Sequence, residues 1–262
     1  MLIDTHCHLA AAAFAGDRDE VVALARALGV SSMLVPAVDV ASFTEVRECC
    51  ARHAGCVPAF GIHPLFVKSA GEADLAALRE WLQRVSDGPQ WPVAVGEIGL
   101  DFFVADPDVE KQEYFFVEQL KIARATDLPV LLHVRRSVDQ VLKYLRRITV
   151  RGGIAHAFNG SRQQADEFVR LGFRLGFGGA LTYSGSTRIR HLAATLPLAS
   201  IVLETDAPDM PPEWLAGGRN TPAQLPRINA VLAELRGIDA NDLARATALN
   251  ALAVLPRLRS AD

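Results

Sequence analysis

The chain has 262 residues, of which 50% are hydrophobic and 22% are charged. This length and composition suit one large domain, such as an α/β barrel, as well as two small ones. The formal net charge of -3 and the pI near 6.2 exclude the strong basic field that drives binding along a nucleic-acid duplex. Any anionic substrate must therefore be bound by a local site.

The start of the chain predicts a protein that is not exported. It has no basic segment, and its longest uncharged apolar run, 9–15, is far too short to cross a membrane. The four cysteines, Cys7, Cys49, Cys50 and Cys56, match neither a paired zinc-binding spacing nor a dense disulfide framework. We therefore expect a protein of the reducing cytoplasm, with no membrane association and no obligate protein partner.

Short β-rich segments recur along the chain. They are 2–6, 32–36, 57–61, 93–97, 129–133, 153–156, 173–177 and 201–206. Between them lie amphipathic segments long enough for crossover helices, among them 18–28, 75–85, 109–125, 139–147 and 163–171. Eight repeats of strand and helix predict an α/β fold that closes as a (β/α)8 TIM barrel. The segment 222–255 predicts two C-terminal helices, and no linker divides the chain, so we expect residues 1–262 to form a single domain.

Two histidines, His6 and His8, lie at the end of the first predicted strand. The two-residue period of a strand points both side chains to one face, roughly 7 Å apart along the backbone, which suits two ligands of one metal ion. An H-x-H sequence alone is weak evidence. It is strengthened because His63, His133 and His156 also lie at or just beyond predicted strand ends. These ends surround one mouth in a barrel, so we expect the five histidines to converge there.

Two carboxylates complete the predicted metal site. Glu97 closes the fourth predicted strand and Asp206 the eighth, where a buried acid is costly unless it is paired or bound to a metal. Four imidazoles and two carboxylates suit two divalent cations such as Zn or Mn, with Mg also considered. The predicted ligands are His6, His8, Glu97, His133, His156 and Asp206. Glu97 is the candidate bridge between two ions roughly 3.5 to 4 Å apart.

Such a site predicts hydrolysis of phosphodiester bonds. Two adjacent ions lower the pKa of a shared water and neutralise charge on the attacking and leaving oxygens. Asp206 is a candidate acceptor of the water proton, and Glu204 either orients that water or supports the ligands from behind.

Four further side chains are candidates for binding the substrate. His63, in GIHP, is placed either to donate to a phosphate or to serve only its loop. Arg135, two residues after His133, is a candidate for gripping a phosphate with its guanidinium group. Phe102 and Phe103, in the loop expected after Glu97, are candidates for stacking a base.

The motifs, in this order and spacing, resemble those of the TatD family of metal-dependent deoxyribonucleases. The matching segments are DTHCHL, GIHP, VGEIGLD, LPVLLHVRR, GGIAHAFNG and LETDAPDMP, followed by RNTP. The double arginine and LETDAPDMP are similar to the YjjV-like branch of that family. The segment HAFNG departs from the commonest family form at Ala157 and Asn159, beside the candidate ligand His156.

The resemblance implies a TIM barrel with two metal ions that hydrolyses nucleic-acid ends. One ion would be bound by His6, His8, Glu97 and Asp206, and the other by Glu97, His133 and His156. The substrate expected from it is nucleic acid or a small phosphodiester.

Two other functions compete with this interpretation. An amidohydrolase-type enzyme acting on an amide or carboxylic ester also places H-x-H, two later histidines and an aspartate on a barrel. Its binuclear members commonly bridge the metals through a carboxylated lysine, whereas the four lysines here lie in a predicted loop and in predicted helices. A barrel that has lost catalysis and serves as a scaffold is the third possibility, and the presence of all six candidate ligands counts against it.

Overall fold

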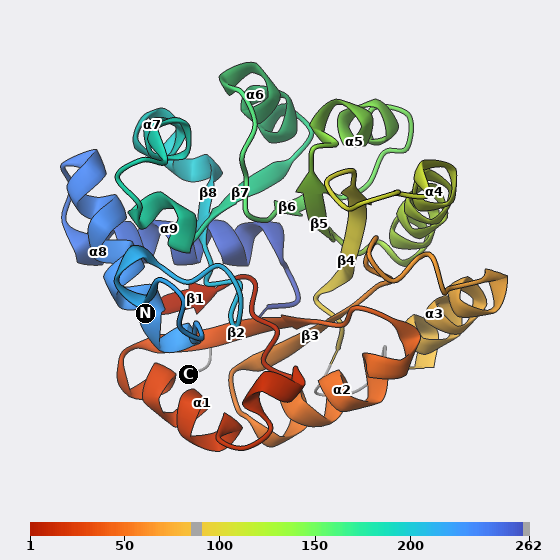
Figure 1. Ribbon diagram of the computed structural model, residues 1–262, viewed down its shortest axis with the longest axis horizontal. Coiled ribbons are helices and arrows are strands. Elements are labelled where there is room, and N and C mark those ends of the chain that lie inside the picture. The colour runs from red at the N-terminus through yellow and green to blue at the C-terminus, as the bar shows by residue number, and fades with distance from the viewer. Residues whose placement is uncertain (85–90, 259–262) are drawn as a thin grey trace.

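The computed structural model describes residues 1–84 and 91–258, and eight parallel strands form its central sheet (Figure 1). Each strand is hydrogen-bonded to the next in chain order, as predicted. The strands are β1 (Leu2–Asp4), β2 (Val30–Pro36), β3 (Cys56–Phe60), β4 (Ala94–Asp101), β5 (Val130–Arg135), β6 (Gly153–Ala155), β7 (Phe173–Phe177) and β8 (Ile201–Leu203). The predicted (β/α)8 fold class is confirmed.

The barrel closes through the segments that follow β1 and β8. The amide of Thr5 donates to the carbonyl of Leu203 over 3.0 Å, and the amide of Asp206 donates to the carbonyl of His6 over 2.8 Å. The amide of His8 then donates to the carbonyl of Ala207 over 2.7 Å. This seam therefore joins the first and last strands through the residues that carry three of the predicted metal ligands.

Helices surround the strands and cover their outer faces (Figure 1). They are α1 (Arg18–Ala27), α2 (Phe43–Arg52), α3 (Glu72–Arg84), α4 (Val109–Thr126), α5 (Val138–Leu145), α6 (Arg162–Arg170), α7 (Thr187–Thr195), α8 (Leu225–Arg236) and α9 (Ala240–Val254). The predicted helix 75–85 corresponds to α3, and its last residue, Val85, lies outside the described residues. In the ranges 1–84 and 91–258, no helix is both long and apolar enough to cross a membrane.

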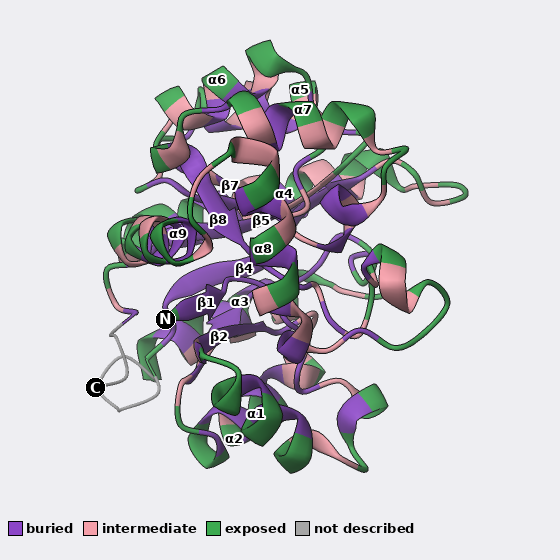
Figure 2. Ribbon diagram, turned by 90° about the vertical axis from the view of Figure 1, so that its left-hand side faces the viewer, coloured by how far each residue is buried: buried purple, intermediate pink, exposed green. Residues whose placement is uncertain are grey.

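The hydrophobic core has two layers. The larger layer lies between the strands and the surrounding helices, whose outer faces remain exposed (Figure 2). The smaller layer fills the barrel itself, where Leu34, Leu131 and Val202 pack against Ala251 and Leu255 from the end of the chain. Helix α9 thus closes the end of the barrel at which the strands begin, which leaves the ends of the strands open to a substrate.

Several strand ends differ from the sequence prediction, and those of β1, β8 and β4 affect the site. β1 ends at Asp4 and β8 at Leu203, so His6 and Asp206 lie in the closing seam and not in strands. β4 runs on past Glu97 to Asp101, because its pairing with β5 shifts register between Val95 and Ile98 and then resumes. Glu97 lies in this irregular stretch, and such shifts commonly redirect a side chain.

Gly99 allows β4 and β5 to approach closely. Its φ is 149°, and a Cβ there would lie 1.9 Å from the carbonyl oxygen of His133. We expect Gly99→Ala to lower the free energy of unfolding by about 4 kcal/mol or more, because the two strands must separate. Gly29→Ala is the matched control, since Gly29 also has a positive φ, 91°, but open space around it, and should cost about 1 kcal/mol. Urea unfolding measures both, and equal losses would contradict the expectation.

Candidate metal centre

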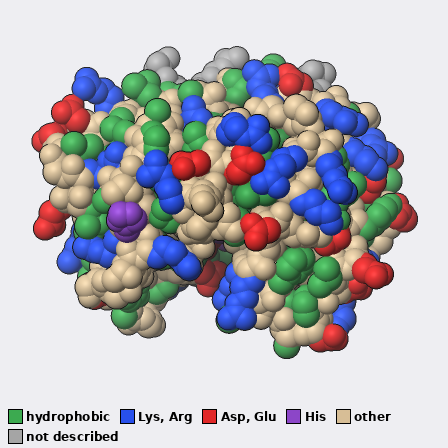
Figure 3. Space-filling view, turned by 90° about the horizontal axis from the view of Figure 1, so that it is seen from above, with side chains coloured by type: hydrophobic (Ala, Val, Ile, Leu, Met, Phe, Trp, Pro, Cys, Tyr) green, Lys and Arg blue, Asp and Glu red, His purple; other side chains and the backbone are tan. Residues whose placement is uncertain are grey.

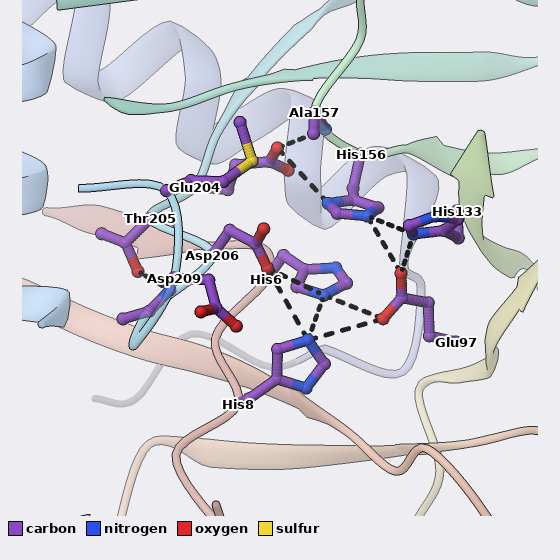
Figure 4. A network of polar contacts seen from close by, with 12 residues as sticks. His6, His8, Glu97, His133, His156, Ala157, Glu204, Thr205, Asp206 and Asp209 are labelled. Carbon is purple, nitrogen blue, oxygen red and sulfur yellow. Dashed lines mark hydrogen bonds and ion pairs between the residues drawn. The ribbon is translucent and has the colours of Figure 1, made fainter. Parts of the chain in front are cut away.

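All six predicted metal ligands meet at the mouth of the barrel (Figure 4). His6 and His8 come from the segment after β1, Glu97 from β4 and Asp206 from the segment after β8. The remaining two, His133 in β5 and His156 directly after β6, approach from the other side of Glu97. The sequence prediction that these distant residues converge is confirmed.

Glu97 lies at the middle of this cluster and is fully buried. Its Oε2 atom is 3.2 Å from Nε2 of His6 and 3.5 Å from Nε2 of His8. Its Oε1 atom is 2.9 Å from Nε2 of His156 and 3.0 Å from Nδ1 of His133. Each carboxylate oxygen therefore faces a different pair of histidines, which is the arrangement that a bridging ligand requires.

Asp206 completes the half of the site formed by His6 and His8. Its Oδ1 atom lies 3.5 Å from Nε2 of His6 and 3.6 Å from Nε2 of His8. His156 also belongs to this group, because its ring stacks on that of His6 with centroids 3.9 Å apart. The backbone of Asp206 is left-handed, with φ of 56°, which turns its side chain into the mouth.

The arrangement of the nitrogen and oxygen atoms suits bound divalent cations better than it suits direct hydrogen bonds between these side chains. Nε2 of His6 and Nε2 of His8 face each other at 3.1 Å, so one of the two must carry a proton unless a cation lies between them. Oε2 of Glu97, Nδ1 of His6 and Nδ1 of His156 are buried and have no hydrogen-bond partner among the described residues. Imidazole and carboxylate donors at such spacing suit Zn or Mn. The residues therefore fit a metal centre, and in the part of the chain that is described they offer three overlapping groups of ligands.

The charges of the cluster are strongly coupled. Burial opposes ionisation of Glu97, but the neighbouring His63, His6 and His156 outweigh it and hold its pKa well below the usual value. Burial also opposes protonation of His156, but the charges of Glu97 and nearby acids raise its pKa to about 10. Burial and the charge of His156 lower the pKa of His6. Without a cation, the ring of His156 therefore keeps a proton at neutral pH.

His63 enters the cluster more deeply than the sequence suggests. Its Nε2 atom lies 3.1 Å from Nδ1 of His133 and 3.4 Å from Oε1 of Glu97, which makes it a geometric candidate for a ligand. However, its Nδ1 atom accepts a hydrogen bond from the amide of Leu65 over 3.1 Å. A neutral His63 must then carry its proton on Nε2, which favours donation to a substrate over binding a cation.

Asp101 is a buried residue of the site whose role the sequence does not reveal. Its Oδ2 atom accepts from Nε2 of His133 over 2.9 Å, which directs Nδ1 of that ring toward Glu97. Such a carboxylate fixes the orientation of a histidine ligand and increases its basicity. The backbone of Asp101 is clamped in turn, because the side chain of Gln112 bonds both its amide and its carbonyl. The motif VGEIGLD contains this acid, but only the register between β4 and β5 brings it to His133.

Asp4 is a second buried acid without a predicted role. It accepts from the amide of Thr205 over 2.9 Å and from its hydroxyl over 2.6 Å, and so joins β1 to the segment that leads to Asp206. Burial raises its pKa to about 7. Asn220, from RNTP, holds the other side of this segment by donating to the carbonyls of Thr205 and Asp209. Both residues position Asp206 through its backbone.

Glu204 lies behind the ligands and follows β8 directly. Its Oε1 atom accepts from the amide of Ala157 over 2.5 Å and is 3.8 Å from Nδ1 of His156 (Figure 4). Burial raises its pKa to about 8. This position favours a role for Glu204 in supporting the ligands from behind. Activation of water by Glu204 stays a prediction.

The other sequence candidates lie near the mouth or in the core. Arg135 ends β5 and is half-exposed, with its Nη1 atom 4.0 Å from Oδ2 of Asp101. Phe103 is exposed and lies beneath the Arg135 guanidinium. Cys7, which lies between His6 and His8 in the sequence, is fully buried and packs in the hydrophobic core. Binding of a phosphate by Arg135 stays a prediction.

Metal uptake should release protons. At pH 7 the raised pKa of His156 keeps a proton on its ring, and a cation binds only the unprotonated nitrogen. We expect at least one proton to leave per chain and the affinity for Zn or Mn to fall as the pH is lowered from 8 to 6. Calorimetry in two buffers of different ionisation enthalpy counts the protons. A count of zero would show that the histidines are already neutral.

The role of His63 can be separated from that of His133. We expect His63→Ala to keep its bound metal, because its Nε2 atom carries a proton, and His133→Ala to lose metal, because Nδ1 of His133 faces Glu97. Elemental analysis after equal metal loading and gel filtration measures both variants. Loss of metal from His63→Ala would identify His63 as a ligand.

Comparisons with known proteins agree with these motifs over nearly the whole chain. The family model described as TatD related DNase matches residues 3–256. The metal-dependent hydrolase YjjV of Escherichia coli K12 is 42% identical over 245 residues, which cover 93% of each chain. The 3'-5' ssDNA/RNA exonuclease TatD of Klebsiella pneumoniae is 34% identical over 243 residues, which cover 90% of each chain.

The crystal structure of YjjV, a TatD homologue from Escherichia coli, agrees with the fold. It superposes with a TM-score of 0.93 at 41% identity and covers 97% of this chain and 98% of that chain. The family model and the relatives thus match the chain from the first strand to the last helix. The chain belongs to the family of TatD-related DNases.

Proposed function

We propose that the chain is a metal-dependent phosphodiesterase that cleaves single-stranded or terminal nucleic acid with two divalent cations. This proposal rests on the position of the Glu97 carboxylate, whose two oxygens face separate groups of histidines. A single-ion site needs no such bridge. The names of the relatives, a metal-dependent hydrolase and an ssDNA/RNA exonuclease, support hydrolysis and the class of substrate.

The open side of the site determines how a substrate approaches. Side-chain exposure is 19% for His8, 15% for His133 and 13% for Asp206, against 1% for Glu97. Bound cations would supply an activated water and would neutralise charge on the phosphate oxygens. Asp206, on the open side, is the candidate acceptor of the water proton, and Nε2 of His63 is the candidate donor to a phosphate oxygen. Zn and Mn suit these ligands best.

The distribution of surface charge favours short or single-stranded substrates. On the face shown in Figure 3, Lys and Arg side chains are interspersed with Asp and Glu side chains. Several arginines are paired with acids, since Arg146 contacts Glu167 at 3.0 Å and Arg151 contacts Asp127. The net charge of -3 adds no attraction for a long duplex. Contacts at the mouth must therefore provide most of the binding.

The lysines argue against an amidohydrolase with a carboxylated-lysine bridge. All four lie away from Glu97, Lys68 in an exposed loop and the others on α4 and α5. Lys121 contacts Glu118 and the amine of Lys111 donates to the carbonyl of Lys68.

We also propose the cytoplasm as the site of action, which the four buried free thiols support.

The function can be tested with a panel of substrates. Metal-stripped protein is incubated with single-stranded DNA, RNA, an aryl phosphodiester and an aryl carboxylic ester, with Mg, Mn or Zn added in turn. We expect metal-dependent cleavage of the phosphodiesters, and we expect Glu97→Ala and Asp206→Ala to lower kcat at least about 10²-fold while they unfold as cooperatively as the wild type. Asp242→Ala, which removes an exposed carboxylate on α9, is the matched control and should retain full turnover.

The outcomes separate the competing functions. Full turnover in both site variants would remove the proposed site. Cleavage of the carboxylic ester alone would identify an amidohydrolase-type enzyme. A protein that binds no metal and cleaves no substrate would support the scaffold function.

A further inference from the structure

Three side chains form an exposed cluster beside the metal centre, and we call it the arginine platform. Phe103 follows β4, Arg135 ends β5, and Arg136 lies in the turn that leads into α5. The guanidinium carbon of Arg135 lies 3.8 Å from the centre of the Phe103 ring, and that of Arg136 lies 4.5 Å from it. All three residues are exposed. Two cationic groups are therefore gathered on one aromatic ring at the mouth, where each retains donors for an anion.

The platform is attached to the metal centre by one carboxylate. Asp101 accepts from the amide of Phe103 over 2.8 Å and from the ring of His133 over 2.9 Å. Its Oδ2 atom, which bonds His133, is also 4.0 Å from Nη1 of Arg135. The platform and a predicted metal ligand are thus fixed to the same buried group. This connection sets the distance between the reacting site and the arginines.

A hollow of about 380 Å³ continues from the platform toward α5 and α6. Its lining is both polar and apolar, with Phe102 and Val138 beside Arg136, Asp139, Gln140 and Gln164. Arg136 borders both the platform and this hollow, and its backbone is left-handed, with φ of 54°. A non-glycine residue adopts this conformation at an energetic cost, and such positions concentrate at binding sites.

We propose that the platform and the hollow form a subsite for the nucleotide next to the scissile phosphate. Arg135 binds the neighbouring phosphate, a base stacks on the layer formed by its guanidinium group and Phe103, and the hollow accepts the sugar or the following base. This inference rests on the proposed phosphodiesterase function and specifies its substrate as an oligonucleotide rather than an isolated phosphoester.

The chemistry of the subsite matches a nucleotide better than other anions. A guanidinium group forms two parallel hydrogen bonds to a phosphate and also offers a flat face on which a base can stack. The side-chain amides of Gln140 and Gln164 are held by Glu113, Ser161 and Asp139, so they form a fixed polar wall beside which a sugar or a base can lie. Stacking on aromatic groups tolerates any base, so the subsite predicts little sequence preference.

The test compares two substrates whose reacting groups are alike. A single-stranded trinucleotide reaches the subsite, whereas an aryl phosphodiester reaches only the metal centre. We expect Phe103→Leu to increase the ratio of the KM for the trinucleotide to the KM for the aryl ester roughly tenfold. We expect kcat to stay similar for both substrates. Trp91→Leu is the matched control, because Trp91 is also exposed and contacts Arg257 but precedes β4 at the opposite end of the barrel, and it should change neither KM.

Binding without turnover provides an independent measurement. Fluorescence anisotropy with a labelled trinucleotide is carried out in the Asp206→Ala background, alone and combined with Phe103→Leu or Arg135→Gln. We expect both combinations to weaken binding about tenfold, and Arg135→Gln to reduce the salt dependence by roughly one phosphate contact. Melting temperature and metal content are measured for every variant.

These results distinguish the subsite from the proposed function. Wild-type protein that cleaves neither substrate, yet binds the trinucleotide in a Phe103-dependent way, would overturn the phosphodiesterase function and support the subsite. Unchanged binding and unchanged KM ratios in the variants would overturn the subsite and leave the function intact. Equal losses on both substrates together with loss of metal would show that Phe103 only positions Asp101, and would also overturn it.

Discussion

The structure of the mouth depends on one buried carboxylate. Glu97 would be strongly disfavoured in the barrel without the imidazoles around it, which face both of its carboxylate oxygens. The strands hold these groups together, because the barrel beneath them is filled and closed by α9. Stability therefore resides at one end of the barrel and the reactive arrangement at the other.

Closure of the barrel and assembly of the site are the same event. The seam between β1 and β8 is made by backbone hydrogen bonds of His6, His8 and Asp206, so the three ligands come into register only when the barrel closes. Asp4 and Thr205 secure this seam with side-chain hydrogen bonds just below the ligands. A barrel with an open seam would lack half of the centre, whatever its loops do.

The sequence predicts the parts of this structure that depend on local pattern. Each strand reads as a short β-rich run, and each ligand lies at or just beyond the end of such a run in the sequence, so the order of strands and the convergence of the six residues are predicted correctly. The extension of β4 is missed, because Gly96 and Gly99 interrupt its pattern and their role depends on close contact with β5. The function of Asp101 is missed for a related reason, since it arises from the pairing of two strands and not from neighbours in the chain.

The backbone just beyond the ligands explains how substrate binding can vary while the centre stays fixed. Arg136, Ala157 and Asp206 each adopt a left-handed conformation, and each lies at or soon after the end of a different strand. At these points the chain turns abruptly out of the sheet, so the side chains that follow are directed to the rim and not into the barrel. The ligands are held by strand pairing, whereas the rim is held mainly by side-chain contacts such as that of Phe103 with Arg135. Substitutions at the rim can therefore alter which substrate is bound without moving the reacting groups.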